Sequence, residues 1–480
     1  MRGIWTTDRI RKAEERLLAA TPEGALMQRA AFGVAVQAAE MLAAHTGRVA
    51  GSRVVLLVGA GNNGGDALWA GQFLRKRGVA VTAVLLNPGK AHPEGLQALR
   101  RAGGRTVGLE DAPGVLDAAD LVIDGIVGLS ARGPLRADAA SLLDHLSAPV
   151  LAVDLPSGVD PDKGTVDGPA ITAARTVTFG ARKPLHVLNP QHCGEVVLID
   201  IGLLPELSDP DLQQLNAVDV GLAWPVPGPA DNKYSQGVTG IAAGSATYPG
   251  AAVLATGSAV LATSGMVRYA GPAADLVRAR WPEAIATGSV TDAGRVQAWV
   301  VGPGIGTGQE GREVLRHVLS EGVPVCADAD ATTLMARYPD VLDARDPGTP
   351  LVLTPHAGEF ERLTGTAPGA DRVAAVKAAA RKFDAVVLLK GNTTLVAAPD
   401  GRVLANVARG SWLATAGSGD VLSGLVGALL ASGLDPWLAA GAAAYVHSLA
   451  ADLAARGVPV SASGVEAAIP AAIRQVRRLS

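Results

Sequence analysis

Polar side chains that can exchange protons follow three short apolar segments in the first half of the chain. The segments span 53–59, 119–125 and 149–154, and each has the leucine-rich or β-branched composition of a buried strand. The polar residues are Asn62, Asn63, Asp66, Asp124, Asp154 and Ser157. Because the carboxyl ends of parallel strands meet at one edge of a sheet, we expect these side chains to line one crevice. A carboxylate placed there is suited to general acid–base catalysis.

The first of these polar runs also has the spacing of a phosphate-binding turn. Residues 59–64 read Gly-Ala-Gly-Asn-Asn-Gly and fit GxGxxG between a strand and a helix. Glycines at such a turn let backbone amides approach a phosphate. The ordinary dinucleotide fingerprint also has an acid at the end of the second strand, where this chain has Asn87 and Pro88. The motif therefore favours nucleotide binding weakly, and a simple tight turn is the alternative.

A second glycine-rich motif lies near the C-terminus. Residues 415–420 read Thr-Ala-Gly-Ser-Gly-Asp and precede an apolar helix. Amides at a helix N-terminus stabilise a transferring phosphoryl group, and Asp420 on the first turn is well placed to deprotonate an attacking hydroxyl. The alternative is that Asp420 only caps the helix, as aspartate often does. The sequence has no GxxxxGK[ST] motif, so a P-loop is not expected.

Strand-like and helix-like segments alternate around these motifs. This alternation predicts parallel sheets that are covered by helices on both faces. A proline-containing stretch at 222–237 interrupts the pattern, which restarts at 238–244. We predict an α/β fold with two domains: a Rossmann-like, three-layer α/β/α domain at 1–218, a linker at 219–236, and a second α/β domain at 237–480.

Composition excludes several classes of protein. With 48% hydrophobic and 18% charged residues, the chain is not disordered. A net charge of −3, without a basic cluster, gives no footprint for nucleic acid. Cys193 and Cys326 form no CxxC motif, so neither a disulfide framework nor a zinc cage is expected. The early charged residues and the interrupted apolar stretches predict no secretory signal and no membrane span, and hence a cytoplasmic location.

In combination, the motifs of the first half resemble one family. GAGNNGGD (59–66), DGIVGLSARGP (124–134) and DLPSGVD (154–160) are similar to the epimerase domain of NAD(P)H-hydrate repair enzymes. The resemblance implies that Asp154 is the catalytic acid/base and that potassium (K⁺) binds at Asn63, Asp124 and Ser157. It implies that the hydrated dinucleotide is bound by Asn62, Asn63, Gly64, Gly65, Asp66, Gly128, Leu129, Ser130, Ala131, Arg132, Gly133, Pro134 and Asp154. Ala67 stands where the family usually has glycine, and we expect its methyl group to narrow the pocket.

The second half resembles the ribokinase-like superfamily, and within it the ADP-dependent NAD(P)H-hydrate dehydratases. The similarity rests on NKYSQG (232–237), GSATYPGAA (244–252), GPGIG (302–306), TPHAGEF (354–360), KGNTT (390–394) and TAGSGD (415–420). It implies a ribokinase-like α/β domain in which Asp420 is the catalytic base and magnesium (Mg²⁺) assists. Contacts to the hydrate are implied for Ala252, Gly304, His356 and Asp420. Contacts to ADP are implied for Lys390, Gly391, Asn392, Thr393, Thr394 and Gly419.

These observations predict a bifunctional enzyme that epimerises R- and S-NAD(P)H hydrate and dehydrates the S form at the expense of ADP, releasing AMP and phosphate. Its partners are then small molecules, namely NADH and NADPH hydrates and ADP, without nucleic acid or membrane, in a homo-oligomer. One alternative makes the second domain a kinase for a vitamin-like alcohol. Another makes the first domain a nucleotide- or RNA-binding module, which Asp124, Asp154 and the acidic charge balance disfavour.

Overall fold

The computed structural model describes residues 1–130, 133–263 and 265–480. These residues form two compact units: a first unit, Gly3–Leu212, and a second unit, Met1–Arg2 with Gln213–Ser480. The boundary lies a few residues before the predicted end of the first domain at 218. The predicted linker at 219–236 begins inside helix α9 (Ala217–Ala223), which packs against helix α18 (Ala462–Leu479) of the second unit. A capping box at Asn216 and Asp219 starts α9, a local signal that the proline-based linker assignment overlooked.

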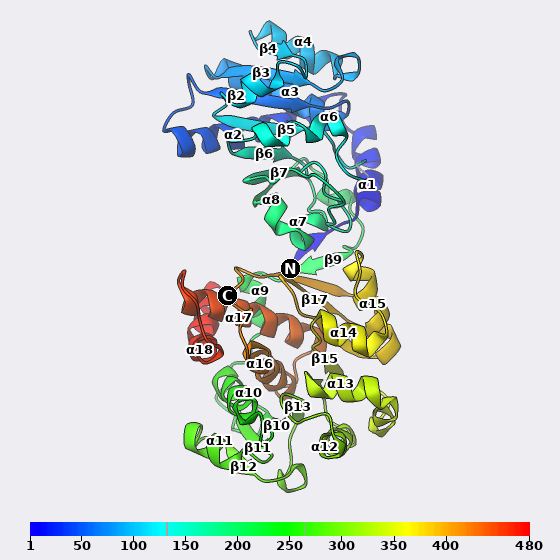
Figure 1. Cartoon of the computed structure of the whole chain (residues 1–480), viewed down its shortest axis with the longest axis vertical. Helices are drawn as coiled ribbons and strands as arrows, with labels where there is room; N and C mark the ends of the chain where they lie inside the picture. The colour runs from blue at the N-terminus through cyan, green and yellow to red at the C-terminus, as the bar shows by residue number, and fades with distance from the viewer. Residues whose placement is uncertain (131–132, 264) are drawn as a thin grey trace. The chain divides into compact units, whose positions relative to one another are not determined.

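A parallel sheet forms the centre of the first unit (Figure 1). Its strands, in spatial order, are β4 (Arg105–Val107), β3 (Ala80–Leu85), β2 (Arg53–Val58), β5 (Leu121–Gly125), β6 (Val150–Val153), β7 (Arg175–Phe179) and β8 (Glu195–Ile199). Leu56 of β2 packs in the apolar cluster beneath α1–α4, whereas its neighbour Leu57 packs beneath α5 and α6. The helices are α1 (Thr7–Ala19), α2 (Ala25–Thr46), α3 (Asn62–Lys76), α4 (Pro93–Arg101), α5 (Ala112–Leu116), α6 (Ala137–Ala140), α7 (Leu185–Leu188) and α8 (Pro190–Cys193). This is the predicted three-layer α/β/α arrangement.

The direction of chain progression across this sheet reverses between β2 and β5. The chain moves outward from β2 to β3 and β4, and then continues on the other side with β5. Ligands bind in such sheets at the carboxyl ends of the strands beside the reversal. Gly59 follows β2 there, and a Cβ at Gly59 would lie 1.8 Å from the carbonyl oxygen of Ile126, after β5. Glycine is therefore required for the close approach of these two loops.

The second unit contains a larger sheet with the same kind of reversal, between β10 and β13. Its order is β1 (Arg2–Ile4), β9 (Leu212–Gln214), β18 (Val403–Val407), β17 (Thr393–Ala397), β16 (Val386–Leu389), β15 (Leu351–Leu353), β14 (Val325–Ala327), β13 (Ala298–Val301), β10 (Val238–Ala242), β11 (Met266–Ala270) and β12 (Ile285–Thr287). Neighbouring strands from β16 to β12 are parallel, whereas β17 is antiparallel to both β16 and β18.

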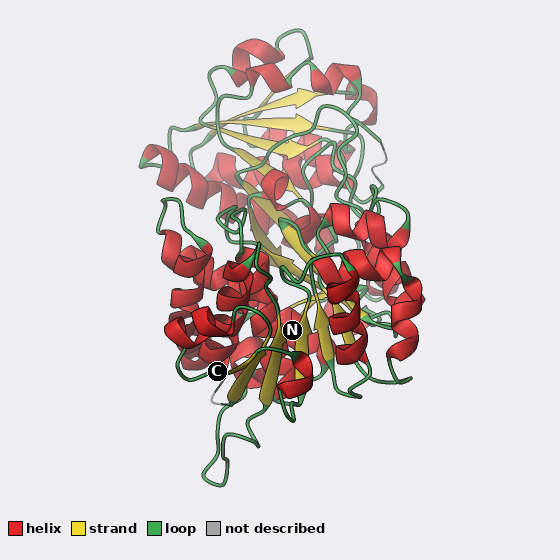
Figure 2. Cartoon of the chain, turned by 60° about the horizontal axis from the view of Figure 1, so that its bottom comes forward, coloured by secondary structure: helices red, strands yellow, loops and turns green. Residues whose placement is uncertain are grey.

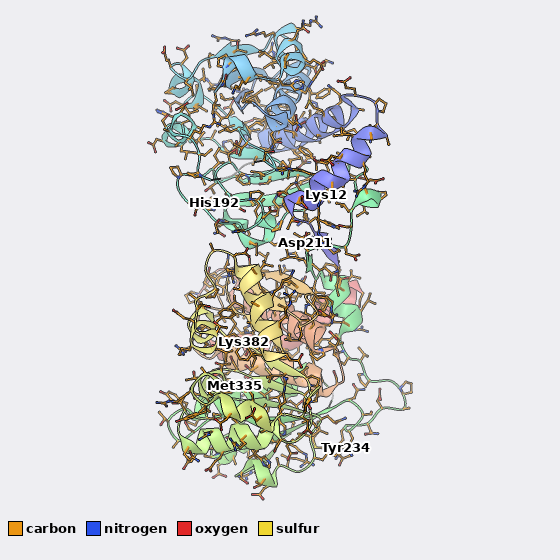
Figure 3. The ribbon with its side chains drawn as sticks, turned by 90° about the vertical axis from the view of Figure 1, so that its right-hand side faces the viewer. Lys12, His192, Asp211, Tyr234, Met335 and Lys382 are labelled. Atoms are coloured by element: carbon orange, nitrogen blue, oxygen red, sulfur yellow. The ribbon has the colours of Figure 1, made fainter. Side chains whose placement is uncertain are left out.

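Helices lie on both faces of this sheet (Figure 2). One face carries α9, α10 (Pro249–Ala262), α11 (Ala274–Arg280), α16 (Ser418–Ala431), α17 (Pro436–Ala455) and α18, which share one apolar cluster. Four helices connect strands β13 to β16, namely α12 (Gln309–Leu319), α13 (Asp330–Arg337), α14 (Ala357–Thr364) and α15 (Arg372–Phe383). Before β10, an exposed loop carries Tyr234, which Figure 3 labels.

Helix α17 is, among the described residues, the one helix long and apolar enough to cross a membrane by length and composition. However, 72% of its most apolar stretch is buried inside the unit. A buried core helix of a globular protein meets the same criterion, so the composition of α17 is weak evidence for a membrane span.

Candidate functional sites

In the first unit, the three residues of the predicted cation site lie together at the carboxyl edge of the sheet. The backbone amide of Ser157 donates to Asp124 Oδ2 at 2.8 Å, and its hydroxyl donates to Asp124 Oδ1 at 2.7 Å. The side-chain amide of Asn63 donates to the carbonyl oxygens of Val127 at 2.9 Å and Val153 at 2.6 Å. Loops that follow β2, β5 and β6 are thereby joined, and several oxygen atoms are brought together.

Asp124 is fully buried, and its hydrogen-bond donors are neutral. Burial raises the pKa of its carboxyl group to about 6, although hydrogen bonds from Ser157 and Ile126 act in the opposite direction. A buried carboxylate without a cationic partner is costly. Oxygen ligands are those that hard cations prefer. The donor set therefore fits a hard cation.

Asp154, just after β6, is held by a buried lysine. Lys183 Nζ lies 2.5 Å from Asp154 Oδ1, and the Thr178 hydroxyl donates to the same oxygen at 3.0 Å. Thr178 lies on strand β7, and Lys183 lies in the segment that follows this strand. The backbone φ of Asp154 is +70°, a value that costs a non-glycine residue about 1–3 kcal/mol. Such strain persists where the surroundings fix the backbone, which is common at functional sites.

Three further titratable groups surround Asp154. His186 Nε2 lies 3.1 Å from the Asp154 carbonyl oxygen, while Nδ1 accepts from the Lys183 amide at 3.0 Å. Burial is the main cause and the charge of Lys183 the second cause that lower the pKa of His186 well below its usual value, so the ring is neutral. Burial, and to a smaller extent the negative charges of Asp154 and Glu14, raises the pKa of Asp66 well above its usual value. Burial also raises the pKa of Glu14 on α1, with Lys183 opposing. Within the described part of the chain, the site therefore holds protonatable carboxyl groups beside the buried ammonium of Lys183.

The loop 128–134, the predicted dinucleotide contact, borders this cluster. Gly128 lies against Asn63, because a Cβ at Gly128 would be 2.6 Å from Asn63 Oδ1. Arg11 Nη2 on α1 donates to the carbonyl oxygen of Leu129 at 2.7 Å. Of the remaining loop residues, Ala131 and Arg132 lie outside the described part of the chain.

The expectation that Ala67 narrows the pocket is wrong. Its side chain is completely buried, and a Cβ at Gly125 would lie 2.7 Å from the Ala67 methyl group. The methyl group therefore fills the contact between α3 and β5 and adds no surface to the pocket.

In the second unit, the motifs found in the sequence follow the carboxyl ends of neighbouring parallel strands. GPGIG follows β13, TPHAGEF follows β15 and KGNTT follows β16. At the chain reversal, the Gly244 amide after β10 donates to the Pro303 carbonyl oxygen after β13 at 2.7 Å. Helix α16 packs across β10, β13 and β14 and carries Asp420 on its first turn. The motifs are thus assembled at one edge of the sheet.

Asp420 is not the cap of its helix. The N-cap is Gly417, with a φ of +85°, and no side chain caps the helix; Asp420 is the third helical residue. Burial, followed by the charge of Asp328, raises the pKa of Asp420 to about 7, with Lys390 opposing the shift. A carboxylate with such a proton affinity is suited to act as a general base near neutral pH.

Next to Asp420 lies a pocket of about 300 Å³. Of the residues predicted to bind the nucleotide, Lys390, Gly391, Asn392, Thr394 and Gly419 line it. Thr393 does not: it is buried, and its carbonyl oxygen accepts from Arg372 at 2.8 Å. His447 of α17 also lines the pocket, and burial lowers the pKa of its ring to about 4. The neutral imidazole of His447 therefore forms part of the pocket wall.

The residues predicted to contact the hydrate occupy different settings. His356 is the N-cap of α14, and its Nδ1 accepts from the amides of Gly358 at 3.0 Å and Glu359 at 3.3 Å. Its ring is half exposed, so capping and ligand contact are compatible. Gly304 has a φ of +66° and packs against Tyr248. Ala252 is fully buried, and a Cβ at Gly244 would lie 2.9 Å from its methyl group, so the structure shows no accessible surface of Ala252 for the predicted contact.

Each of the two units matches a known protein family. Residues 23–185 match the family described as YjeF-related protein N-terminus, and residues 239–470 match the family described as NAD(P)H-hydrate dehydratase. A bifunctional NAD(P)H-hydrate repair enzyme of Mycobacterium leprae is 54% identical over 471 residues, which is 96% of this chain and 97% of that one. The chain belongs to the bifunctional NAD(P)H-hydrate repair enzymes. A Mycobacterium tuberculosis member is 56% identical over 90% of each chain.

Solved structures resemble the second, dehydratase unit of this repair enzyme. The ADP/ATP-dependent NAD(P)H-hydrate dehydratase of Bacillus subtilis, co-crystallised with ATP and Mg²⁺, matches with a TM-score of 0.50 and 28% identity, over 55% of this chain and 99% of that chain. A ribokinase-like superfamily protein of Enterococcus faecalis matches with a TM-score of 0.51 and 22% identity, over 56% and 98%. The dehydratase unit therefore has a ribokinase-like fold.

Sequence reasoning missed several polar residues of the repair enzyme's two sites. In the first, epimerase unit, they are Lys183, Thr178, His186 and Glu14; in the dehydratase unit, they are Asp328, Glu359, Ser423 and His447. A signal was available for three of them: Thr178 lies near the carboxyl end of β7, Asp328 directly follows β14, and Glu359 lies inside the TPHAGEF motif. The others come from helices or loops, where the apolar-run pattern gives no indication of a site.

Proposed function

We propose that the two units perform successive reactions on one damaged cofactor, at the residues described above. The epimerase unit interconverts R- and S-NAD(P)H hydrate at Asp154. The dehydratase unit converts the S form to NAD(P)H at Asp420, consuming ADP and releasing AMP and phosphate. The two activities complement each other, because a stereospecific dehydratase alone leaves the R form unrepaired.

For epimerisation, the hydrate carries a hydroxyl group at C6, beside the ring nitrogen. When Asp154 gives a proton to this hydroxyl, the nitrogen lone pair expels water. Water then returns to either face of C6, and the carboxylate accepts its proton. Lys183 and Thr178 bind Oδ1, which leaves Oδ2 free of hydrogen bonds within the described part of the chain and available to the substrate. Positioned proton transfer of this kind contributes about 10²–10⁴ in rate.

A potassium ion at Asn63, Asp124 and Ser157 is proposed for the epimerase unit. Support comes from the burial of Asp124, which has no cationic partner among the described residues, and from the oxygen atoms around it. When bound, the ion neutralises Asp124 and holds the loops after β2, β5 and β6. Crystals soaked in rubidium, a heavier potassium analogue, are expected to show an anomalous peak between the three residues; a map without a peak after full soaking would rule out the site.

For dehydration, Asp420 removes the proton of the C6 hydroxyl, whose oxygen attacks the terminal phosphoryl group of ADP. AMP leaves, and the ring nitrogen then expels phosphate to restore NAD(P)H. Phosphate is a far better leaving group than hydroxide, which explains the use of a kinase-like site. The pocket beside Lys390, Gly391 and Gly419 is proposed to hold ADP. Amides of the first turn of α16 face the phosphoryl group.

Magnesium is proposed to accompany the nucleotide. Among the described residues, no cluster of three or more His, Cys, Asp or Glu is arranged for a metal. Magnesium is usually bound through substrate phosphates and one or two carboxylates rather than by a protein cage. The ion supplies charge neutralisation for phosphoryl transfer.

The observation that supports this function most strongly is the position of Asp420: half-buried on the first turn of α16, next to the pocket, with a pKa raised to about 7. Asp420→Asn preserves size and removes proton acceptance. We expect dehydration, followed at 340 nm, to fall by about 10²–10⁴ while ADP binding and epimerisation persist. Turnover within threefold of wild type would exclude Asp420 as the base.

The kinase alternative predicts that ATP phosphorylates a separate alcohol and that hydrate is no substrate. Incubation of racemic hydrate with ADP or with ATP distinguishes the two functions and also measures the nucleotide preference. A cytoplasmic location and a homo-oligomeric state remain part of the proposal. They are tested by cell fractionation and by sedimentation of the purified chain.

A further inference from the structure

One buried carboxylate of the dehydratase unit contacts the loops that form its site, yet neither the motifs nor the proposed chemistry uses it. Asp328 directly follows β14 and is 1% exposed. Its Oδ1 accepts from Lys390 Nζ at 2.7 Å, and its Oδ2 accepts from the Ser423 hydroxyl at 2.6 Å. The two oxygens thus bind one partner from the KGNTT motif and one from helix α16.

The first partner links Asp328 to the nucleotide pocket. Lys390 lines this pocket and has a second, more distant carboxylate partner, Glu359, at 3.9 Å. Burial alone would lower the pKa of Lys390, but the charges of Asp328 and Glu359 outweigh it and raise the pKa. Lys390 is therefore an ammonium whose position is set mainly by Asp328.

The second partner links Asp328 to the helix that carries Asp420. Ser423 lies one turn after Asp420 on α16, and its hydroxyl also lies 2.9 Å from the carbonyl oxygen of Gly419. A Cβ at Gly419 would lie 3.6 Å from Asp328 Oδ2 and 3.4 Å from Lys390 Nζ. The first turn of α16 therefore rests directly on the Asp328–Lys390 pair.

The backbone of Asp328 contacts a third motif. A Cβ at Gly302, the first residue of GPGIG, would lie 1.9 Å from the Asp328 carbonyl oxygen. This close approach is possible because residue 302 is glycine, with a φ of +125°. Asp328 thus contacts segments that follow β13 and β16, together with α16.

Asp420 faces charged groups from several elements. Asp328 and Asp330 after β14 disfavour its ionised form, whereas Lys390 after β16 favours it. Glu359 of α14 and the neutral His447 of α17 lie beside Lys390. Among these groups, Asp328 affects the pKa of Asp420 most, after burial itself.

We propose that Asp328 is a positioning residue of the dehydratase. It holds the Lys390 ammonium and the first turn of α16 in fixed positions relative to each other. Its negative charge also determines the pH above which Asp420 is ionised and can act as a base. This inference rests on the proposed role of Asp420 as the base. It assigns Asp328 no contact with the substrate. Its effect is to align Lys390, the cation that lines the nucleotide pocket, with the base Asp420, and to keep Asp420 able to exchange a proton near neutral pH.

The test is the pH dependence of dehydration by Asp328→Asn, which removes the charge and conserves the shape. With (S)-hydrate, saturating ADP and Mg²⁺, we expect the acidic limb of kcat/KM to move down by about one pH unit, because a like charge beside Asp420 is lost. We expect KM for ADP to rise by about tenfold, since Lys390 loses its anchor. An unchanged limb together with an unchanged KM would overturn the proposal.

Two variants separate positioning from general damage. Ser423→Ala keeps the charge of Asp328 and frees α16, so kcat should fall by about fivefold with the acidic limb unmoved. If Asp328→Asn does not fold, Ser423→Ala is the deciding test. An unchanged kcat in this variant would contradict the proposed link between Asp328 and α16. Asp340→Asn, a surface carboxylate paired with Arg312 and Arg316, should change neither quantity. A limb shift of equal size in this control would show that the effect is not specific to Asp328.

Failure of the inference can be told from failure of the proposed function. If Asp420→Asn turns over near the wild-type rate, the base is misassigned, whatever Asp328 does. The coupling is then still measurable, because carbon-13 NMR of the Asp420 carboxyl group reports its titration directly. A titration of Asp420 that is identical in wild type and Asp328→Asn would overturn the electrostatic part of the proposal.

Discussion

At the scale of residues, Lys183 distinguishes Asp154 from the other carboxylates of the epimerase unit. Among the described residues, Asp124 and Asp66 have no cationic partner, and burial raises their pKa values. Asp154 instead pairs with Lys183, whose side chain is 1% exposed. Removing one partner of a buried ion pair costs about 3–5 kcal/mol, because the other charge is left uncompensated. The pair therefore links the proposed catalytic residue to the stability of the unit.

Lys183→Met is expected to lower epimerisation by about 10²-fold, because Asp154 loses the group that orients Oδ1. Loss of pure R hydrate, followed by chromatography without nucleotide, measures the rate. Dehydration of the S form should stay unchanged, as should both activities of Lys76→Met, an exposed lysine on α3. Wild-type epimerisation by a folded Lys183→Met protein would show that the pair is purely structural.

Glu466 predicts a pH effect on stability in the dehydratase unit. It is buried on α18, its Oε1 has no hydrogen-bond partner in the described structure, and burial raises its pKa to about 7. Because the folded-state pKa lies above the unfolded one, ionisation opposes folding as pH rises from about 4.5 through 7. Glu466→Gln should therefore unfold at a temperature about 2 °C or more above wild type at pH 8, and near wild type at pH 4.5. Equal differences at both pH values would contradict this.

At the scale of elements, helix α1 contacts the proposed epimerase site, although it lies outside the matched region 23–185. Glu14 points toward the Asp154 cluster, and Arg11 binds the loop 128–134 through the carbonyl oxygen of Leu129. Surface loops are more mobile than the elements that they connect, so an anchor of this kind restricts the motion of the loop.

Arg11→Gln should raise KM for the hydrate in epimerisation by about tenfold, with a smaller change in kcat, because loop order is lost before chemistry begins. Arg16→Gln is the matched control: it lies on the same helix and pairs with Glu206 instead of the loop. If both variants raise KM equally, the effect comes from the helix as a whole and not from the loop anchor.

At the scale of the whole molecule, each unit has its own sheet, apolar core and site. The hydrate is a small molecule that diffuses freely, so nothing in the proposed chemistry requires both activities on one chain.

An equimolar mixture of Asp154→Asn and Asp420→Asn proteins should therefore convert racemic hydrate fully to NAD(P)H. Each variant alone should not: the first should stop near half conversion and the second near zero. Absorbance at 340 nm measures the yield. A mixture that stops at half conversion would show that the hydrate has to pass within one chain.

Much of the fold follows from local sequence. Apolar runs at 53–59, 119–125 and 149–154 contain β2, β5 and β6, because a strand buried on both faces needs continuous apolar residues. The short strands β1, β9, β12 and the β17–β18 hairpin were not predicted. β1 and β12 are edge strands, β9 pairs with the distant β18, and the β17–β18 hairpin is antiparallel and so lies outside the pattern of parallel strands and helices on which the prediction rested.

The same distinction separates the predicted site residues from those that were missed. Asn63, Asp124 and Ser157 could be grouped from sequence, because parallel strands bring their carboxyl ends to one edge. The ion pairs could not be predicted: Lys183 reaches Asp154 across 29 residues, and Ser423 reaches Asp328 across 95. The burial of a charge, its partner and therefore its proton affinity arise when distant segments exclude water together, and this was decided by the tertiary structure alone.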